Sequence, residues 1–141
     1  MIHFTLYSLN GIKYDDDVYE ISIPTLDGEI GVLPNHMPLI SVASHGAILV
    51  RKNANDRDEQ REAFAISGGT IQVEDNTLKI LVDEADHADE LNEAEIREAV
   101  ARAEKMKAEA KDQVSLDHAQ QLIDRQAVRL KVAGLKRRHR G

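Results

Sequence analysis

The sequence has 141 residues, no Cys, 4% aromatic residues and a formal net charge of −7. This length allows one compact domain or a small domain with an appendage, the lack of Cys excludes disulfides and thiolate metal sites, and the acidity argues against a nucleic-acid partner. No apolar run approaches a membrane-spanning length and the N-terminus lacks the features of a signal peptide, so we expect membrane contact only through a partner.

Residues 1–83 contain short β-type runs separated by turn signals. Residues 18–23 and 77–80 alternate polar and apolar side chains, the period of a half-buried strand. The two glycines at 68–69 predict a bulge or a sharp corner between two strands. The three aspartates at 15–17 are expected at a solvated hairpin tip rather than in a cation site. The expected strands are HFTLYS, VYEISIP, GAILVRK, EAFAIS, GTIQVE and TLKILVD, which favour an all-β N-terminal sandwich or flattened barrel of antiparallel strands.

The segment GEIGVLPNHMPLI, residues 28–40, has too many glycines and prolines for a buried strand and too many apolar residues for a simple surface loop. Pro34 and Pro38 each lack a backbone donor, so we expect a rigid edge that does not extend a sheet. In one interpretation its apolar residues belong to the core and only Glu29, Asn35 and His36 face outward. In the other the apolar residues contact a partner, and we expect a mixture of the two.

From about residue 91 the apolar spacing changes to the three-four period of helices. Asn92, with Glu95 three residues later, resembles a capping box and marks the start of a first helix. A break at 112–114 precedes Ser115, which we expect to cap a second helix. The two alanine-rich stripes predict an antiparallel helical hairpin that is weakly held. We therefore divide the chain into residues 1–85, a β-sandwich domain, and residues 86–141, a two-helix domain.

The second helix has a further apolar stripe and a basic end. Val128, Val132 and Leu135 lie on a different face from the stripe that meets the first helix. They either dock on the sandwich, which the pattern favours, or serve an alternative partner. No acidic residue follows Asp124, while seven basic residues do. This end suits either an acidic protein surface or simple placement at a helix C-terminus.

No combination of residues indicates catalysis. Residues 84–87 contain a single Glu-x-x-His, whereas a di-iron bundle needs two copies and two further Glu. Phosphate loops, zinc motifs and nucleophile elbows are missing from the sequence. We expect a non-catalytic protein without metal or cofactor. An enzyme would need a hidden carboxylate site, and the sequence shows no positioned base or nucleophile that would support one.

Two motifs carry a resemblance to a known family. Residues 28–40 are similar to the Gly-Glu-(Leu/Ile)-Gly-x-x-Pro-x-His-x-Pro-Leu segment of the epsilon subunit of bacterial and chloroplast F-type ATP synthases. Ser67-Gly68-Gly69, then Asn76 and residues 81–85 (LVDEA), resemble the second signature of that family. The two-helix end matches its architecture, so the resemblance covers essentially the whole chain.

The resemblance implies a rotor subunit of the central stalk in a proton- or sodium-driven synthase. Such a subunit couples the c-ring to gamma and inhibits ATP hydrolysis when its helices extend along gamma toward the alpha and beta subunits. It implies a peripheral position on the cytoplasmic side of the cell membrane or in the chloroplast thylakoid; the mitochondrial counterpart, called delta, stays open. The implied c-ring and gamma contacts are Glu29, Leu33, Pro34 and His36. The implied contacts of the extended helix with beta and gamma are Arg125, Val128, Arg129, Val132, Leu135, Arg137 and Arg138.

Some members of this family bind ATP through an (Ile/Leu)-Asp-x-x-Arg-Ala motif. Here the matching residues are LNEAEI at 91–96, with Asn92 in place of the acid and Glu95 in place of the Arg. Arg102 keeps a downstream basic position and is the only weak nucleotide-binding candidate. We expect weak or absent ATP binding. The alternative to the rotor subunit is a free-standing β-sandwich module whose basic C-terminal helix docks on an acidic protein.

Overall fold

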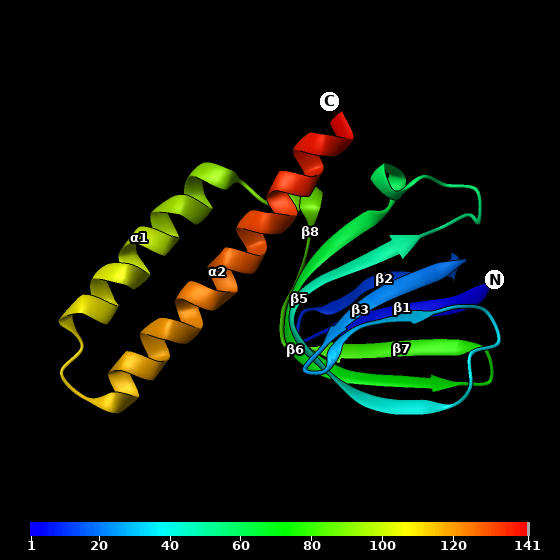
Figure 1. Cartoon of the computed structure of the whole chain (residues 1–141), viewed down its shortest axis with the longest axis horizontal. Coiled ribbons are helices and arrows are strands. Elements are labelled where there is room, and N and C mark those ends of the chain that lie inside the picture. The colour runs from blue at the N-terminus through cyan, green and yellow to red at the C-terminus, as the bar shows by residue number, and fades with distance from the viewer. Residues whose placement is uncertain (141) are drawn as a thin grey trace.

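The computed structural model describes residues 1–140, with side chains described through Leu135. Eight strands precede two helices, and Figure 1 shows the helices beside one end of the strands, with the N-terminus at the other end. The predicted all-β domain with a helical hairpin is therefore confirmed. The strands are β1 (Ile2–Ser8), β2 (Gly11–Val18), β3 (Glu20–Thr25), β4 (Gly28–Val32), β5 (Leu39–Arg51), β6 (Glu62–Glu74), β7 (Thr77–Val82) and β8 (Ala85–His87).

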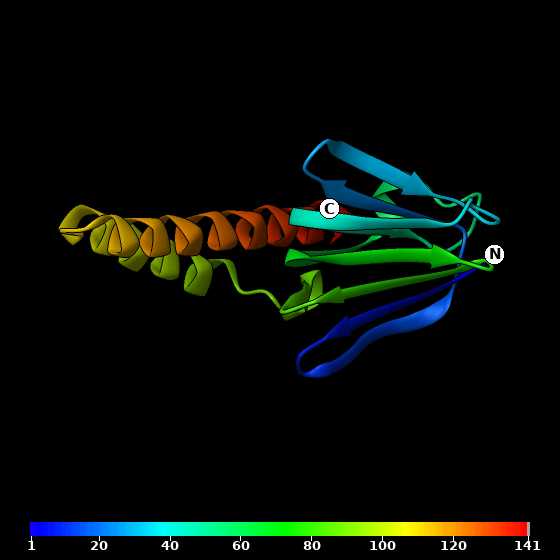
Figure 2. The ribbon, with the colours of Figure 1, turned by 90° about the horizontal axis from the view of Figure 1, so that it is seen from below.

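The strands form a sheet in the order β2-β1-β7-β6-β5-β3-β4, with β8 paired to β6. All neighbours are antiparallel except β1 and β7, which are parallel. The long strands β5 and β6 pair along most of their length and run side by side in Figure 2. The predicted separation of EAFAIS and GTIQVE is wrong, because both belong to the single strand β6.

The glycines at 68–69 form the predicted corner within β6. Pairing with β5 is regular up to Ala43↔Gly69 and resumes at His45↔Ser67. Before the corner Ala43 points into the core, whereas beyond it Ile48 does. The inward-facing positions of β5 therefore switch from odd-numbered to even-numbered residues at the corner, a parity switch. A Cβ on Gly69 would lie 2.1 Å from the Leu81 carbonyl oxygen, so only glycine permits this approach of β6 to β7.

The aspartates at 15–17 lie within β2, not at a hairpin tip, which corrects the prediction. Two of them bracket a histidine across the strand pair: His3 Nδ1 is 2.8 Å from Asp17 Oδ1 and Nε2 is 2.6 Å from Asp15 Oδ1. Asp16 pairs instead with Lys52 at 2.8 Å. His3 on the paired strand β1 and Lys52 just after β5 therefore offset the repulsion among the three carboxylates.

The main hydrophobic core lies between the layers of the folded sheet. Its largest buried side chains come from seven different strands, and the cluster contains no residue of either helix. Phe4, Tyr14 and Phe64 form a chain of ring contacts with centroids 5.4 and 5.7 Å apart. The buried set includes Ile2, Phe4, Leu6, Val18, Ile21, Ile23, Val32, Ile48, Phe64, Ile71, Leu78 and Ile80.

The helices are α1 (Glu93–Glu109) and α2 (Gln113–Arg140), with short 3-10 turns at Asp58–Gln60 and Ala88–Glu90. The Asn92 side chain accepts from the Glu95 N–H at 3.2 Å, as predicted for the start of α1. The prediction for Ser115 is wrong: α2 begins two residues earlier, and the Asp112 carboxylate accepts from the Ser115 N–H at 2.7 Å. Neither helix has the length and hydropathy that crossing a membrane requires in the part of the chain described.

A second, smaller apolar cluster joins α2 to the sheet. Figure 1 shows α2 lying between α1 and the strands. Ala63 and Ala65 of β6 face α2, while Phe64 and Ile66, which alternate with them, face the main core. The same double burial applies to β5 and explains the nearly continuous apolar runs of both strands. This α2 cluster comprises Ala63, Ala65, Ala88, Leu91, Ile96, Val132 and Ala133, with Ala47, Leu49, Val100, Val128, Leu130 and Leu135 packed against it.

Candidate partner-binding surfaces

Residues 28–40 lie at the edge of the sheet, where β4 pairs only with β3. The expectation that this segment stays out of the sheet is wrong for residues 28–32, which form β4, and for Leu39 and Ile40, which begin β5, because both prolines lie between the two strands. The expected mixture of core and surface residues is present: Val32 is fully buried and Ile30 packs against the core, while Leu33 is 42% exposed. Met37 and Ile40 are 77% and 79% exposed.

Glu29 and His36 are placed at opposite ends of β4. Glu29 is exposed beside the β3–β4 turn, where Ser22 Oγ donates to its carboxylate at 3.5 Å. Beyond the other end, the His36 N–H donates to the Leu33 carbonyl at 3.1 Å and closes a turn with Pro34 second. Asn35 occupies the third position with φ of +63°. The structure therefore separates these two implied contact residues along the strand.

An apolar row crosses the outer face of the sheet beyond the corner. Pairing places Val42, Thr70, Leu81 and Tyr7 side by side on four neighbouring strands. Val42 and Leu81 are 61% and 50% exposed. Sequence reasoning missed this row, although Leu81 interrupts the polar–apolar alternation of β7 by standing between two core residues. We call the residues Tyr7, Val42, Thr70 and Leu81 the outer row.

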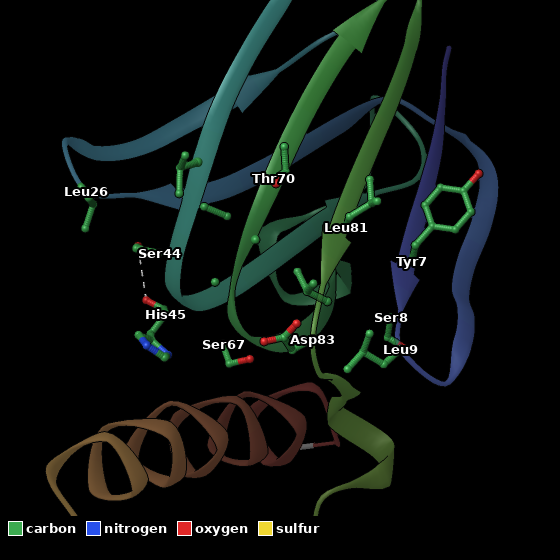
Figure 3. Close-up of a pocket in the computed structure, with 15 residues that line it drawn as sticks. Tyr7, Ser8, Leu9, Leu26, Ser44, His45, Ser67, Thr70, Leu81 and Asp83 are labelled. Carbon is green, nitrogen blue, oxygen red and sulfur yellow. Dashed lines mark hydrogen bonds between the residues drawn. The ribbon is translucent and has the colours of Figure 1, made fainter. Parts of the chain in front are cut away.

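The outer row borders a shallow hollow of about 690 Å³, which Figure 3 shows near α2. The turn residues Leu9 and Leu26 stand at its rim and are 81% and 85% exposed. The Ser67 Oγ at the hollow is buried and has no hydrogen-bond partner among the residues described. Exposed apolar side chains gathered around a concave site are typical of a protein-contact surface.

The face of α2 implied in extended contacts is turned toward the sandwich. Val132 is fully buried in the α2 cluster and Val128 and Leu135 pack beside it, which confirms the favoured interpretation that this stripe docks on the sandwich. Arg125 and Arg129, one turn apart, reach Glu84 at 3.5 Å and Asp86 at 3.2 Å. The side chains of Arg137 and Arg138 lie outside the described residues.

Arg102, the weak nucleotide-binding candidate, lies on a different helix from Arg125 and Arg129. Arg102 is exposed on α1, next to Ala103, which packs inside the hairpin. Asn92 and Glu95 are joined by the N-cap hydrogen bond. Among the side chains described, no group of three or more His, Asp or Glu residues has an arrangement that could hold a metal ion.

The family model for the ATP synthase delta/epsilon chain β-sandwich domain matches residues 1–88. The chain belongs to the epsilon-subunit family of F-type ATP synthases. The ATP synthase epsilon chain of Chloroflexus aggregans is 35% identical over 134 residues, covering 95% of this chain and 93% of the relative. The chloroplastic epsilon chain of Adiantum capillus-veneris is 34% identical over 124 residues, covering 88% of this chain and 90% of its own.

Solved structures share the fold. A chain in the Euglena gracilis mitochondrial ATP synthase structure with OSCP, F1 and c-ring has a TM-score of 0.77 at 23% identity, over 94% of this chain and 80% of that one. A chain in the Tetrahymena thermophila structure of central stalk and c-ring has a TM-score of 0.61 at 20% identity, over 94% and 95%. As an epsilon-family subunit, the chain is non-catalytic and belongs to a membrane-associated ATP synthase complex.

Proposed function

We propose that this epsilon-family chain is a rotor subunit of the central stalk, coupling the c-ring to gamma on the cytoplasmic side of the membrane. In this proposal the outer row and the turn at His36 bind gamma, while Glu29 at the other end of β4 meets the c-ring. Family membership favours this role over a free-standing binding module. The observation that carries the proposal is the outer row, an apolar surface that α2 does not cover.

The outer row suits a permanent protein contact. Val42 and Leu81 are half-exposed or more in the isolated chain, and Leu9, Leu26 and Ile40 extend the apolar surface around them. Burying one such side chain contributes about 1–2 kcal/mol, so a few together supply much of the affinity of a stable interface. Their β-strand positions keep them ordered, which lowers the entropy lost on binding.

The test is binding of the full chain to the gamma subunit of the same organism. Leu81→Asp should weaken binding at least about tenfold, because a carboxylate then faces an apolar surface without a partner. Val114→Asp, a similar change at a side chain 80% exposed on the hairpin, is the matched control and should leave affinity unchanged. Equal affinities for both variants would exclude the outer row from the gamma interface.

We further propose that residues 86–141 form a regulatory domain that inhibits ATP hydrolysis when it extends from the sandwich. Support comes from the separate α2 cluster: on the sheet side it presents mainly alanines, and its two ion pairs are partly exposed. Partly exposed ion pairs contribute about 0–1 kcal/mol each, so docking is weak compared with the main core. Arg125, Arg129, Arg137 and Arg138 would then be free to meet acidic surfaces of the beta subunits.

Deleting residues 115–141 tests this regulatory role in the assembled complex. The main core contains no residue of either helix, so we expect the truncated chain to assemble as before. ATP hydrolysis should rise because the extended form can no longer be reached. Normal assembly with unchanged hydrolysis would refute the inhibitory role without affecting the proposed coupling role.

A further inference from the structure

We propose that Asn76 is a positioning residue that holds the His36 turn in the form presented to gamma; this inference rests on the proposed function. Asn76 lies in the turn between β6 and β7, far from residue 36 in sequence. Its Oδ1 accepts from the Asn35 N–H at 2.8 Å, and its Nδ2 donates to the Met1 carbonyl at 2.8 Å. One side chain thus links the β4–β5 connection, the β6–β7 turn and the N-terminus.

The accepting bond selects the shape of the His36 turn. With Pro34 second and Asn35 third at positive φ, residues 33–36 have the features of a type II turn. The hydrogen bond of the turn itself runs from the His36 N–H to the Leu33 carbonyl, so the Asn35 N–H needs another acceptor. A type I turn reverses the Pro34–Asn35 peptide group and loses the bond to Asn76. The Asn76 side chain therefore favours the type II form.

The β6–β7 turn that carries Asn76 is itself rigid. Asp75 and Asn76 both have positive φ, +51° and +57°, between the paired residues Glu74 and Thr77, as in a tight type I′ hairpin. The Asn76 carbonyl also accepts from the His3 N–H at 3.2 Å. Asn tolerates this backbone region better than most residues, so the fold places an amide here without strain.

The conformation of the His36 turn also determines which hydrogen-bonding group the His36 ring presents to a partner. Its Nδ1 is 2.6 Å from the Met37 carbonyl oxygen, which can only accept, so Nδ1 carries the proton. In the neutral ring Nε2 is then a hydrogen-bond acceptor. The partner group that fits is an N–H or O–H donor on gamma. Release of the Asn35 N–H would let the Pro34–Asn35 peptide group reorient and move this acceptor.

The experiment compares Asn76→Gly with Asp75→Gly in the full chain. Both changes relieve positive φ in the same turn, but only Asn76→Gly removes the two side-chain hydrogen bonds. Binding to gamma and amide hydrogen exchange at Asn35 are measured for each. We expect Asn76→Gly to lose the protection of the Asn35 amide and to bind gamma about threefold to tenfold more weakly, the range for one hydrogen bond. Asp75→Gly should change neither.

Two further variants separate the possible causes. Asn76→Asp keeps the acceptor for Asn35 but replaces the Nδ2 donor with an oxygen that faces the Met1 carbonyl, so it should restore protection and affinity in part. His36→Ala should weaken binding as Asn76→Gly does. Equal effects of the two glycine variants, or retained Asn35 protection in Asn76→Gly, would overturn the inference. Unchanged affinity in both Asn76→Gly and His36→Ala would also overturn it, whereas Leu81→Asp still tests the proposed function independently.

Discussion

Val132→Asp should release the helical hairpin while leaving the β-sandwich folded. Val132 is fully buried in the α2 cluster, facing sheet alanines rather than polar groups. Full burial of a Val side chain contributes about 1.5–2 kcal/mol. An aspartate there also buries a carboxylate without a partner or drives it into solvent, which brings the cost to at least about 3 kcal/mol. Since 1.4 kcal/mol is tenfold, the docking equilibrium should shift by more than about a hundredfold.

Amide hydrogen exchange measured by mass spectrometry distinguishes release of the hairpin from global unfolding. In Val132→Asp the amides of α2 should exchange much faster, because a detached alanine-rich helix has little to stabilise it. The amides of β1 and β7 should keep their protection, since those strands contribute only to the main core. Ala127→Asp, an exposed position on the same helix, is the matched control and should leave both regions unchanged.

Two results would refute this reasoning. If α2 stays protected in Val132→Asp, the α2 cluster does not hold the hairpin on the sandwich. If the β1 and β7 amides lose protection together with α2, the two clusters unfold as one unit and residues 86–141 are not a separable domain.

Three more predictions follow from single contacts. Gly69→Ala should lower the free energy of unfolding by about 1–3 kcal/mol or more in urea titrations, because its Cβ would meet the Leu81 carbonyl oxygen at 2.1 Å; an unchanged midpoint would contradict the corner geometry. The carboxylates of Asp17 and Asp15 raise the pKa of His3 above its ordinary 6.5. The stabilisation of the folded state by protonated His3 is therefore complete below pH 6.5 and is lost as pH rises through the folded-state pKa. His3→Gln should remove that decline from urea midpoints measured across this window, and an unaltered pH profile would argue against the contact. Calorimetry on the full chain should show that ATP binds weakly or not at all. A micromolar affinity would overturn the interpretation that Glu95, in place of the Arg of the motif, disfavours ATP.

Sequence periodicity predicted the architecture well because each half follows one clear period. It failed where tertiary contacts decide the outcome. Residues 15–17 lie in a strand where His3 on the paired strand β1 and Lys52 just after β5 hold their carboxylates, and no local rule includes those partners. Ser115 and Asp112 are both good N-cap residues, so the choice between them depends on where the turn of the hairpin closes.

The candidate surfaces were predicted only in part. The motif at residues 28–40 led to Glu29 and His36, but their separation along β4 depends on the strand boundaries. The outer row depends on register between strands far apart in sequence, and the parity switch at the corner decides which side chains face out. Hydrophobicity alone could not separate Leu81, which is half-exposed, from its buried neighbours Ile80 and Val82.

The alanines under α2 limit the penalty of undocking as well as the strength of docking. When the helix leaves, Ala47, Ala63 and Ala65 expose only methyl groups and Leu49 is the one large side chain of these two strands that is uncovered, while Phe64 and Ile66 stay covered on the other side of β6. The bared patch is therefore too small and too shallow to recruit other chains or to nucleate aggregation. A surface of this kind can be covered and uncovered many times, so an alanine-lined contact is compatible with the proposed extension of the helix.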